Sequence, residues 1–426
     1  MKIIKNILLI FFLSFNAYTE AQIEEKSFKN IEDKVIKWRH HVHQNPELSN
    51  REFETAKFVS KHLKSLGIKV TENVAYTGVV GVLKGTSPGK VIALRADMDA
   101  LPVTERNNLS FKSIKTALYN GQETGVMHAC GHDTHVSILM GVAEILSKNN
   151  NFPGTIKFIF QPAEESPPPG EEGGAKLMIK EGVLENPKVD AIFGLHINSG
   201  THVGKIKYKP GGMMASSQRF VIKVKGKQAH GSRPWQSVDP ITISAQIING
   251  LQTLVSRESE LTKEAVVISI GSIHSGIRFN IIPEELEMIG TIRTLDKDMK
   301  EHIRTRIKHM VPNIAKAYRG NATVEIKDGA DITFNDPGLT KKMIPSLQKI
   351  VGINNVIEIP AVTGAEDFSY FQSKIPGFYF FLGGTPIEIN ENEAPSHHTP
   401  DFFVDDKSLI IGVKALSQLA IDYLSN

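Results

Sequence analysis

The sequence contains a single cysteine, Cys130, and two tryptophans among its 426 residues. One thiol has no partner within the chain, so an intrachain disulfide is excluded. The formal net charge of +3 is too small to indicate nucleic acid or an anionic membrane as a partner. The sequence also lacks repeats, blocks of like charge and a phosphate-binding glycine loop with its lysine. The remaining composition, 41% hydrophobic and 22% charged, is that of a globular protein long enough for two domains.

The N-terminus carries the one run of apolar residues that predicts targeting. Lys2 and Lys5 precede the apolar residues 7–15, and Ala21 follows as a small residue at a cleavage position. This pattern predicts a secretory signal peptide over residues 1–21. The run is short for a membrane span, although a retained anchor stays an alternative. We therefore expect an exported protein, periplasmic or secreted, with no membrane attachment after cleavage.

Strand and helix patterns alternate along the chain and predict an α/β fold. Amphipathic helices are expected over 31–44, 52–66 and 136–147. The uninterrupted apolar runs 91–94 and 156–160 predict strands covered on both faces, as in a largely parallel sheet. A strand over 189–195 is expected to end at His196. From about residue 213 the pattern changes to that of a small α+β sandwich, and near residue 330 it changes back.

Residues 127–135 place three histidines, an aspartate and the only cysteine together. Thiolate and imidazole are good ligands for Zn²⁺, and imidazole also suits Mn²⁺. In an extended chain Cys130 and His132 would share a face, and Gly131 allows a sharp turn between them. The motif therefore predicts a metal site.

Further candidate ligands follow predicted strands or lie in loops. Glu164 and Glu165 come after a buried strand, His196 follows another, and His398 lies in a late loop. The carboxyl ends of strands in α/β sheets gather at one site. A set of one thiolate, one carboxylate and three imidazoles suits two metal ions sharing a bridging group, and a thiolate can be that bridge. Glu165 binding metal would leave Glu164 free as a general base.

Other readings of these residues remain open. Cys130 could be a nucleophile paired with His132 or His135, a class that needs no metal. The fold could also bind metal or a small ligand without turnover, or serve as an assembly surface. The carboxylate of Glu164 argues for catalysis.

Several ordered motifs make the chain similar to the M20 metallopeptidase family, in its amidohydrolase branch with the hippurate hydrolases and the hydrolases of indoleacetyl-amino acids. The motifs are 43–49, 95–102, 127–135, 161–165, 194–196, 229–231, 279–283, 290–293, 366–368 and 398–400. The resemblance covers the chain from about residue 30 to its end.

The resemblance implies a fold, a reaction and a set of site residues. It implies a zinc-peptidase-like catalytic domain over 25–212 and 330–426, with an inserted lid and dimerisation domain over 213–329. The reaction is hydrolysis of the amide bond of an N-acyl or aryl-acyl amino acid, or of a dipeptide. The implied ligands of the divalent ions, manganese or zinc with cobalt as a third choice, are Cys130, His132, Glu165, His196 and His398.

The same resemblance implies roles for other residues. Glu164 is the general base, and His230 stabilises the developing oxyanion, often across a dimer interface. Asn280 and Arg293 bind the free carboxylate of the substrate. We expect a homodimer or a larger homo-oligomer, in which lid closure brings His230, Asn280 and Arg293 over the metals.

Two departures from the family pattern bear on the site. Asp97 and Asp99 stand where many members carry His-x-Asp, so both are predicted to orient a ligand rather than bind metal. This departure leaves open whether one ion or two are bound. Residues 166–172, with three prolines, form a longer segment that is predicted to shape the rim of the pocket.

Overall fold

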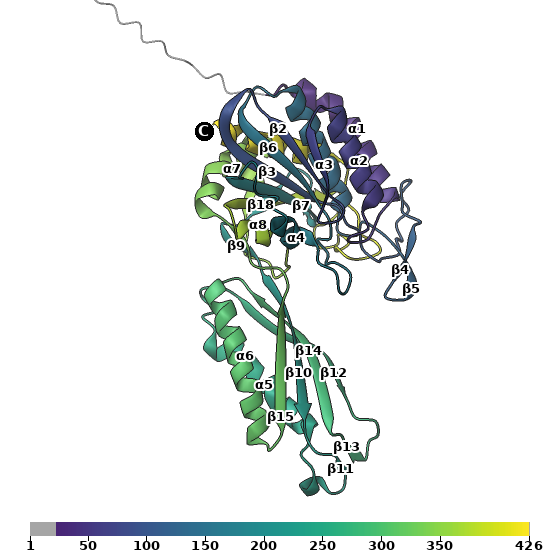
Figure 1. Cartoon of the computed structure of the whole chain (residues 1–426), viewed down its shortest axis with the longest axis vertical. Coiled ribbons are helices and arrows are strands. Elements are labelled where there is room, and N and C mark those ends of the chain that lie inside the picture. Colours follow the sequence, from purple (N-terminus) through teal and green to yellow (C-terminus); the bar gives the residue numbers. More distant parts are fainter. Residues whose placement is uncertain (1–22, 426) are drawn as a thin grey trace, which may run out of the picture.

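The computed structural model describes residues 23–425, so the predicted signal peptide lies outside the described residues. The chain folds into a large lobe and an elongated small lobe joined by a narrow connection (Figure 1). The small lobe comprises residues 216–328, which fall within the inserted segment predicted from the sequence. Among the described residues, no helix is both long and apolar enough to cross a membrane.

A mixed eight-stranded sheet forms the centre of the large lobe. In spatial order its strands are β1 (Lys69–Val74), β2 (Gly78–Lys84), β6 (Pro153–Gln161), β3 (Ser87–Asp97), β7 (Ala191–His202), β18 (Gly377–Thr385), β8 (Ile206–Tyr208) and β17 (Val356–Glu358). The central strands β6, β3, β7 and β18 run parallel, whereas β1–β2, β2–β6 and β18–β8 pair antiparallel. The prediction of a largely parallel sheet therefore holds for its centre.

Helices cover both faces of this sheet. The helices of the large lobe are α1 (Glu25–Gln44), α2 (Phe53–Ser65), α3 (His132–Lys148), α4 (Gly174–Lys180), α7 (Pro337–Val351), α8 (Ser369–Gln372) and α9 (Lys407–Ser425). Successive residues of β3 alternate between two cores: Ile92 and Leu94 pack with α1, α3 and α9, and Ala93 packs with α4 and α8. This double burial explains the uninterrupted apolar run of β3.

Several elements differ in extent from their predictions, and two of the differences affect the site. Helix α1 begins at Glu25, and α3 begins at His132 rather than at residue 136. Strand β7 does not end at His196, because its pairing with β18 continues to His202. His196 therefore lies within a strand.

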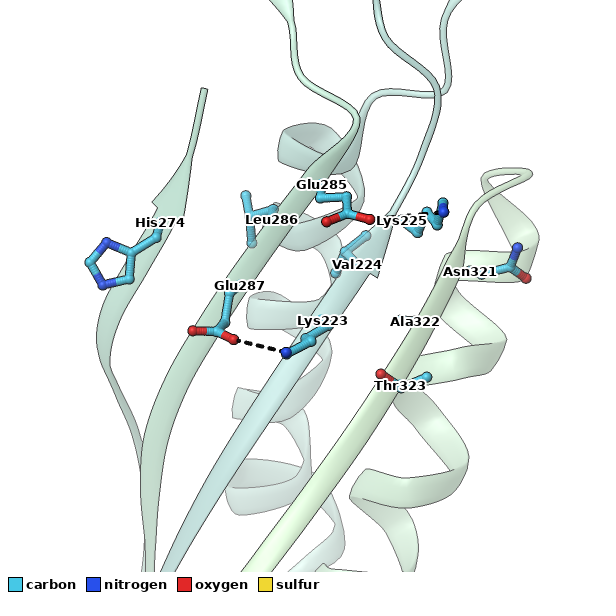
Figure 2. A pocket seen from close by; sticks show the side chains of 10 residues that line it. All are labelled: Lys223, Val224, Lys225, His274, Glu285, Leu286, Glu287, Asn321, Ala322 and Thr323. Atoms are coloured by element: carbon cyan, nitrogen blue, oxygen red, sulfur yellow. Dashed lines mark ion pairs between the residues drawn. The ribbon is translucent and has the colours of Figure 1, made fainter. Parts of the chain in front are cut away.

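The small lobe is a two-layer α+β sandwich with its own core. Its antiparallel sheet has the order β12 (Val266–Ser275), β14 (Glu285–Thr294), β10 (Ser216–Lys225), β15 (Asn321–Asp328). Helices α5 (Pro240–Glu258) and α6 (Lys297–Ala317) bury the apolar residues of one sheet face. On the other face a hollow of about 450 Å³ is lined by charged residues, among them the ion pair of Lys223 and Glu287 (Figure 2).

Short strands complete the lobes. They are β4 (Thr116–Tyr119) with β5 (Gln122–Gly125), β9 (Gly211–Met214) with β16 (Thr333–Asn335), and β11 (Ala229–His230) with β13 (Ile281–Ile282). The pair β9–β16 lies where the lobes join, and β11–β13 lies at the tip of the small lobe farthest from the large lobe (Figure 1). The 3₁₀ turns are Pro234–Gln236 and Ile353–Asn355.

Candidate functional site

A pocket of about 1130 Å³ lies at the carboxyl end of the central strands, next to the connection between the lobes. Its lining includes Cys130, Glu164, Glu165, His196 and His398. These residues come from loops and strands that are far apart in the sequence. The pocket therefore contains four of the five predicted ligands, and the fifth, His132, is buried directly behind them.

Cys130 and His132 converge because the backbone turns between them. Gly131 has a φ of +93°, and His132 is the first residue of α3, so the stretch is not extended as the motif suggested. A Cβ on Gly131 would lie 2.3 Å from Cγ2 of Ile197. Both the left-handed conformation and the close approach require glycine here.

His132 has one ring nitrogen engaged and the other unpartnered. Its Nδ1 donates to the backbone oxygen of Asp99 at 2.8 Å, so the lone pair of the neutral ring would be on Nε2. That Nε2 is buried and has no hydrogen-bond partner among the described residues. The carboxylate of Asp99 also accepts the backbone N–H groups of Glu164 and Glu165, at 3.1 and 2.9 Å. Asp99 thus lies behind the site and holds His132, Glu164 and Glu165 in place.

His196 and His398 both direct Nε2 at the thiol of Cys130. In His196 the Nδ1 donates to the backbone oxygen of Ile197 at 2.6 Å, and Nε2 lies 3.4 Å from Sγ. In His398 the Nε2 lies 3.3 Å from Sγ and 3.0 Å from Oε1 of Glu165. Ligand atoms of Cys130, His132 and His196 lie within 4.8 Å of one another, and so do those of Cys130, Glu165 and His398. These two groups share Cys130, so its thiol lies next to ligand atoms of both, and the side chains are of the types that divalent cations bind.

The electrostatics of these groups favour bound cations. Burial, and then the charge of Glu165, raises the pKa of the Cys130 thiol well above its ordinary value. A thiolate at this position therefore needs a compensating positive charge. Burial lowers the pKa of His132, but Asp97 and Asp99 outweigh it and raise that pKa to about 10. A cation on Nε2 of His132 would take the place of this proton.

Glu164 lies directly beside the predicted ligands, and one of its carboxylate oxygens is within 4.8 Å of ligand atoms of His132 and Glu165. Its Oε1 accepts the backbone N–H of Asp367 at 3.3 Å, and its Oε2 lies 3.9 Å from Nε2 of His132. Burial, and then the charge of Glu366, raises the pKa of Glu164 well above its ordinary value. A carboxylate with raised proton affinity beside the ligand cluster suits a general base.

Two further histidines lie in the cluster, and neither was predicted from the sequence to orient the site. His135 donates to Asp97 at 2.5 Å and accepts the N–H of Ile197 at 2.8 Å. His397 donates to the backbone oxygen of Cys130 at 3.1 Å and accepts the N–H of Ser199 at 3.2 Å. With both ring nitrogens engaged, these histidines orient the site and do not offer a ligand atom. The spacing from His132 to His135, one turn of helix, is the signal that could have placed the latter.

The predicted substrate-binding residues are divided between the two ends of the small lobe. Arg293 lines the pocket, is half-buried, and has no ion pair or side-chain hydrogen bond within residues 23–425. His230 and Asn280 lie at the far tip, in and beside the β11–β13 pair (Figure 1). Strands β10 and β14 are ten residues long and span roughly 33 Å between the two ends.

This division corrects the expectation that closure of one lobe brings His230, Asn280 and Arg293 together over the site of the same chain. Rotation of the small lobe about its connection preserves the distance of its tip from that connection. The pocket lies beside the connection and Arg293 already lines it, so a rotation of the lobe could not bring His230 and Asn280 of the same chain to the site.

Comparison with known proteins places the chain among metal-dependent hydrolases. The family model "Peptidase family M20/M25/M40" matches residues 93–422. Thermostable carboxypeptidase 2 of Saccharolobus solfataricus is 44% identical over 93% of this chain and 96% of its own length. IAA-amino acid hydrolase ILR1-like 2 of Arabidopsis thaliana is 34% identical over 98% and 94%.

A solved structure agrees with these matches. The YXEP protein of Bacillus subtilis, described as a dinuclear metal-binding peptidase of the M20 family, has a TM-score of 0.77. It is 33% identical, and the match covers 93% of this chain and 99% of that one. The ligand cluster described above is what such a divalent-metal site requires. The chain therefore belongs to the M20/M25/M40 peptidase family, and it is an M20-type metal-dependent amide hydrolase.

Proposed function

We propose that this enzyme hydrolyses the amide bond of N-acyl amino acids, with small dipeptides as a second substrate class. The observation that carries the proposal is the convergence of Cys130, His132, Glu165, His196 and His398 beside the free carboxylate of Glu164. The names of the relatives support it: one is an IAA-amino acid hydrolase, another an N-acetyl-L-cysteine deacetylase and a third a carboxypeptidase.

We further propose two ions per subunit, manganese or zinc, with Cys130 as the shared ligand. Bound divalent cations would polarise the amide carbonyl and lower the pKa of a water molecule. Glu164 is placed to accept a proton from the attacking water and would pass it to the leaving amine, which its raised pKa permits. Arg293 holds the free carboxylate of the substrate, because its guanidinium is half-buried in the pocket and pairs with no acid among the described residues.

We propose a homodimer, or a larger homo-oligomer, in which the tip of one small lobe completes the site of another subunit. His230 and Asn280 cannot reach the site of their own chain, so the partner subunit's His230 would stabilise the oxyanion. Three large apolar side chains are also left exposed at the tip, Trp235 (71%), Ile277 (92%) and Phe279 (94%). Such a patch is suited to contact with a second copy.

Export to the periplasm or the medium is also a proposal, supported by the N-terminal sequence pattern alone. The rim role of residues 166–172 is supported by contacts, since Glu171 in that segment is held by Arg51 and Asn50 and lines the pocket. Deletion of the segment should change the substrate profile, and an unchanged profile would contradict the rim role.

The test of the function is a hydrolysis screen of the protein loaded with Mn²⁺ or Zn²⁺ against N-acetyl, N-benzoyl and indoleacetyl amino acids and dipeptides. We expect amino acid release from at least one acyl series, abolished by chelation. Glu164→Gln should lower kcat by about 10²- to 10⁴-fold while the metal content stays the same. Activity that survives complete chelation would favour Cys130 as a nucleophile, and metal binding without any turnover would favour a binding protein.

A further inference from the structure

We propose that Tyr379 and Glu366 are positioning residues for Glu164. They fix a turn whose backbone N–H, that of Asp367, holds the carboxylate of Glu164 in place. The inference rests on the proposed function, because it assigns these residues to the general base of that reaction. Glu366 lies in the pocket lining beside Glu164, and Tyr379 is buried behind it. The motif 366–368 was noted in the sequence, but no role was predicted for Glu366 or Tyr379.

Glu366 is buried, and donors surround both of its carboxylate oxygens. Oε2 accepts the hydroxyl of Tyr379 at 2.7 Å. Oε1 accepts Nη2 of Arg95 at 2.9 Å and the backbone N–H of Phe368 at 3.0 Å. A carboxylate with three donors from three segments has one orientation available to it.

The same bonds fix the backbone on either side of Asp367. The side chain of Glu366 binds the N–H of Phe368, two residues later, and its backbone oxygen accepts the N–H of Ser369 at 3.3 Å. Asp367 lies between these fixed points, so the direction of its N–H is set by Glu366. That N–H points at Oε1 of Glu164, at 3.3 Å.

Arg95 joins this turn to the sheet that carries the ligand cluster. Its guanidinium is fully buried and donates to Asp97 at 2.7 Å, as well as to Glu366 and Asp367 at 2.9 Å. Asp97 in turn holds His135, which packs beside His132. One buried cation thus sets the spacing between the turn behind Glu164 and the histidines behind the metal ligands.

Glu164 needs such support because its neighbours repel it. Carboxylate oxygens of Asp97, Glu164 and Glu366 lie within 4.8 Å of one another. Like charges at this distance push a free side chain away unless a hydrogen bond holds it. A displacement of about 1 Å in a reacting group can cost as much as 100-fold in rate.

The test removes one hydroxyl. Tyr379→Phe keeps the ring packing and deletes the bond to Oε2 of Glu366, so we expect kcat to fall about 10-fold with KM and metal content unchanged. Tyr208→Phe is the matched control, because Tyr208 is also a buried strand tyrosine but its hydroxyl has no hydrogen bond to the described chain. A kcat equal to that of the wild type, or an equal loss in the control, would overturn the inference.

A second measurement separates positioning from general loosening. Tyr379→Phe is combined with Glu164→Asp, whose shorter side chain cannot reach the N–H of Asp367. If Tyr379 acts through Glu164, the hydroxyl deletion should cost less than 2-fold in this background. A full 10-fold loss there, or a lower metal content in Tyr379→Phe alone, would show a structural role instead. Failure of the wild type to release any amino acid would reject the proposed function itself.

Discussion

The two lobes of this molecule differ in where their charged side chains lie. In the large lobe, buried charges are held by one another: Arg39 binds Asp133, Arg95 binds three carboxylates, and His43 lies between Asp133 and Glu105. At the small lobe the charges lie on the open face of a sheet, and the functional candidates His230 and Asn280 are at the exposed tip. Buried ion pairs therefore hold the ligand cluster of the large lobe in place, whereas the tip of the small lobe leaves His230 exposed, which suits the contact between subunits that we propose.

The largest expected effect is that of mutations that test whether the tip of one small lobe reaches the site of a second subunit. Glu164→Gln and His230→Ala should each lower kcat by at least about 100-fold. When the two variants are mixed and allowed to exchange subunits, one site in four would combine an intact Glu164 with the partner subunit's His230. We therefore expect about a quarter of the wild-type activity per site to return, measured by amino acid release over time.

Two controls bound this experiment. Mixing either variant with itself should restore nothing, and covalent cross-linking of the subunits before mixing should prevent recovery. Additive residual activities after complete exchange would mean that His230 serves no site in trans.

The next effect concerns His43, one of the buried charged side chains of the large lobe. Burial lowers the pKa of His43, but its bonds to Asp133 and Glu105 outweigh burial and raise it to about 9, from an ordinary value of 6.5. The folded-state pKa is raised, so this stabilisation is complete below about pH 6.5 and is lost as the pH rises through 9. The shift corresponds to about 3 kcal/mol at most.

We expect His43→Gln to destabilise the protein at pH 6 and to do so by about 3 kcal/mol less at pH 10, measured by denaturant unfolding at both values. His41→Gln, an exposed neighbour on α1, should leave the unfolding free energy unchanged at both. A cost of His43→Gln that does not vary with pH would mean that His43 is not held as a cation.

A smaller effect concerns Asp99, which hydrogen-bonds to the predicted metal ligands from behind. Asp99→Asn removes a negative charge and places an N–H₂ group where the N–H groups of Glu164 and Glu165 donate. Loss of such a supporting group typically costs 10- to 100-fold in metal affinity, and we expect that range for Mn²⁺ or Zn²⁺ by titration calorimetry. Asp239→Asn, which changes only the cap of α5, should bind metal as the wild type does. Unchanged affinity in Asp99→Asn would leave Asp99 with a role in folding alone.

The sequence predicted the large lobe's site better than the small lobe's because strand ends are readable from local patterns. The apolar runs of β3 and β6 placed Asp97 and Glu164 at the carboxyl ends of adjacent parallel strands, which is where the structure has them. The turn at Gly131 was not predictable, because its left-handed conformation depends on packing against Ile197 and Phe402 from distant segments. The same holds for His397, whose two partners, Cys130 and Ser199, are far away in the sequence.

For the small lobe, the family motifs predicted His230, Asn280 and Arg293 as site residues. They did not predict at which end of the lobe each residue lies. The residues that precede and follow each motif predict strands, yet the pairing register decides which end of the lobe each residue occupies. In the structure Arg293 pairs with Ser217 at the connection, whereas Glu285 pairs with Lys225 at the opposite end of the same two strands. Register is a tertiary property here, since β10 and β14 are separated by α5 and β12.

The smallest expected effect tests the open face of the small lobe. Lys223 and Glu287 form a 3.5 Å ion pair with 70% and 36% of their side chains exposed. Exposed pairs contribute at most about 1 kcal/mol, so Glu287→Gln should change the unfolding free energy by less than about 0.5 kcal/mol at physiological salt. Chemical denaturation at several protein concentrations measures this. A larger loss that grows on dilution would place this face in a contact between subunits, in addition to the contact that we propose for the tip.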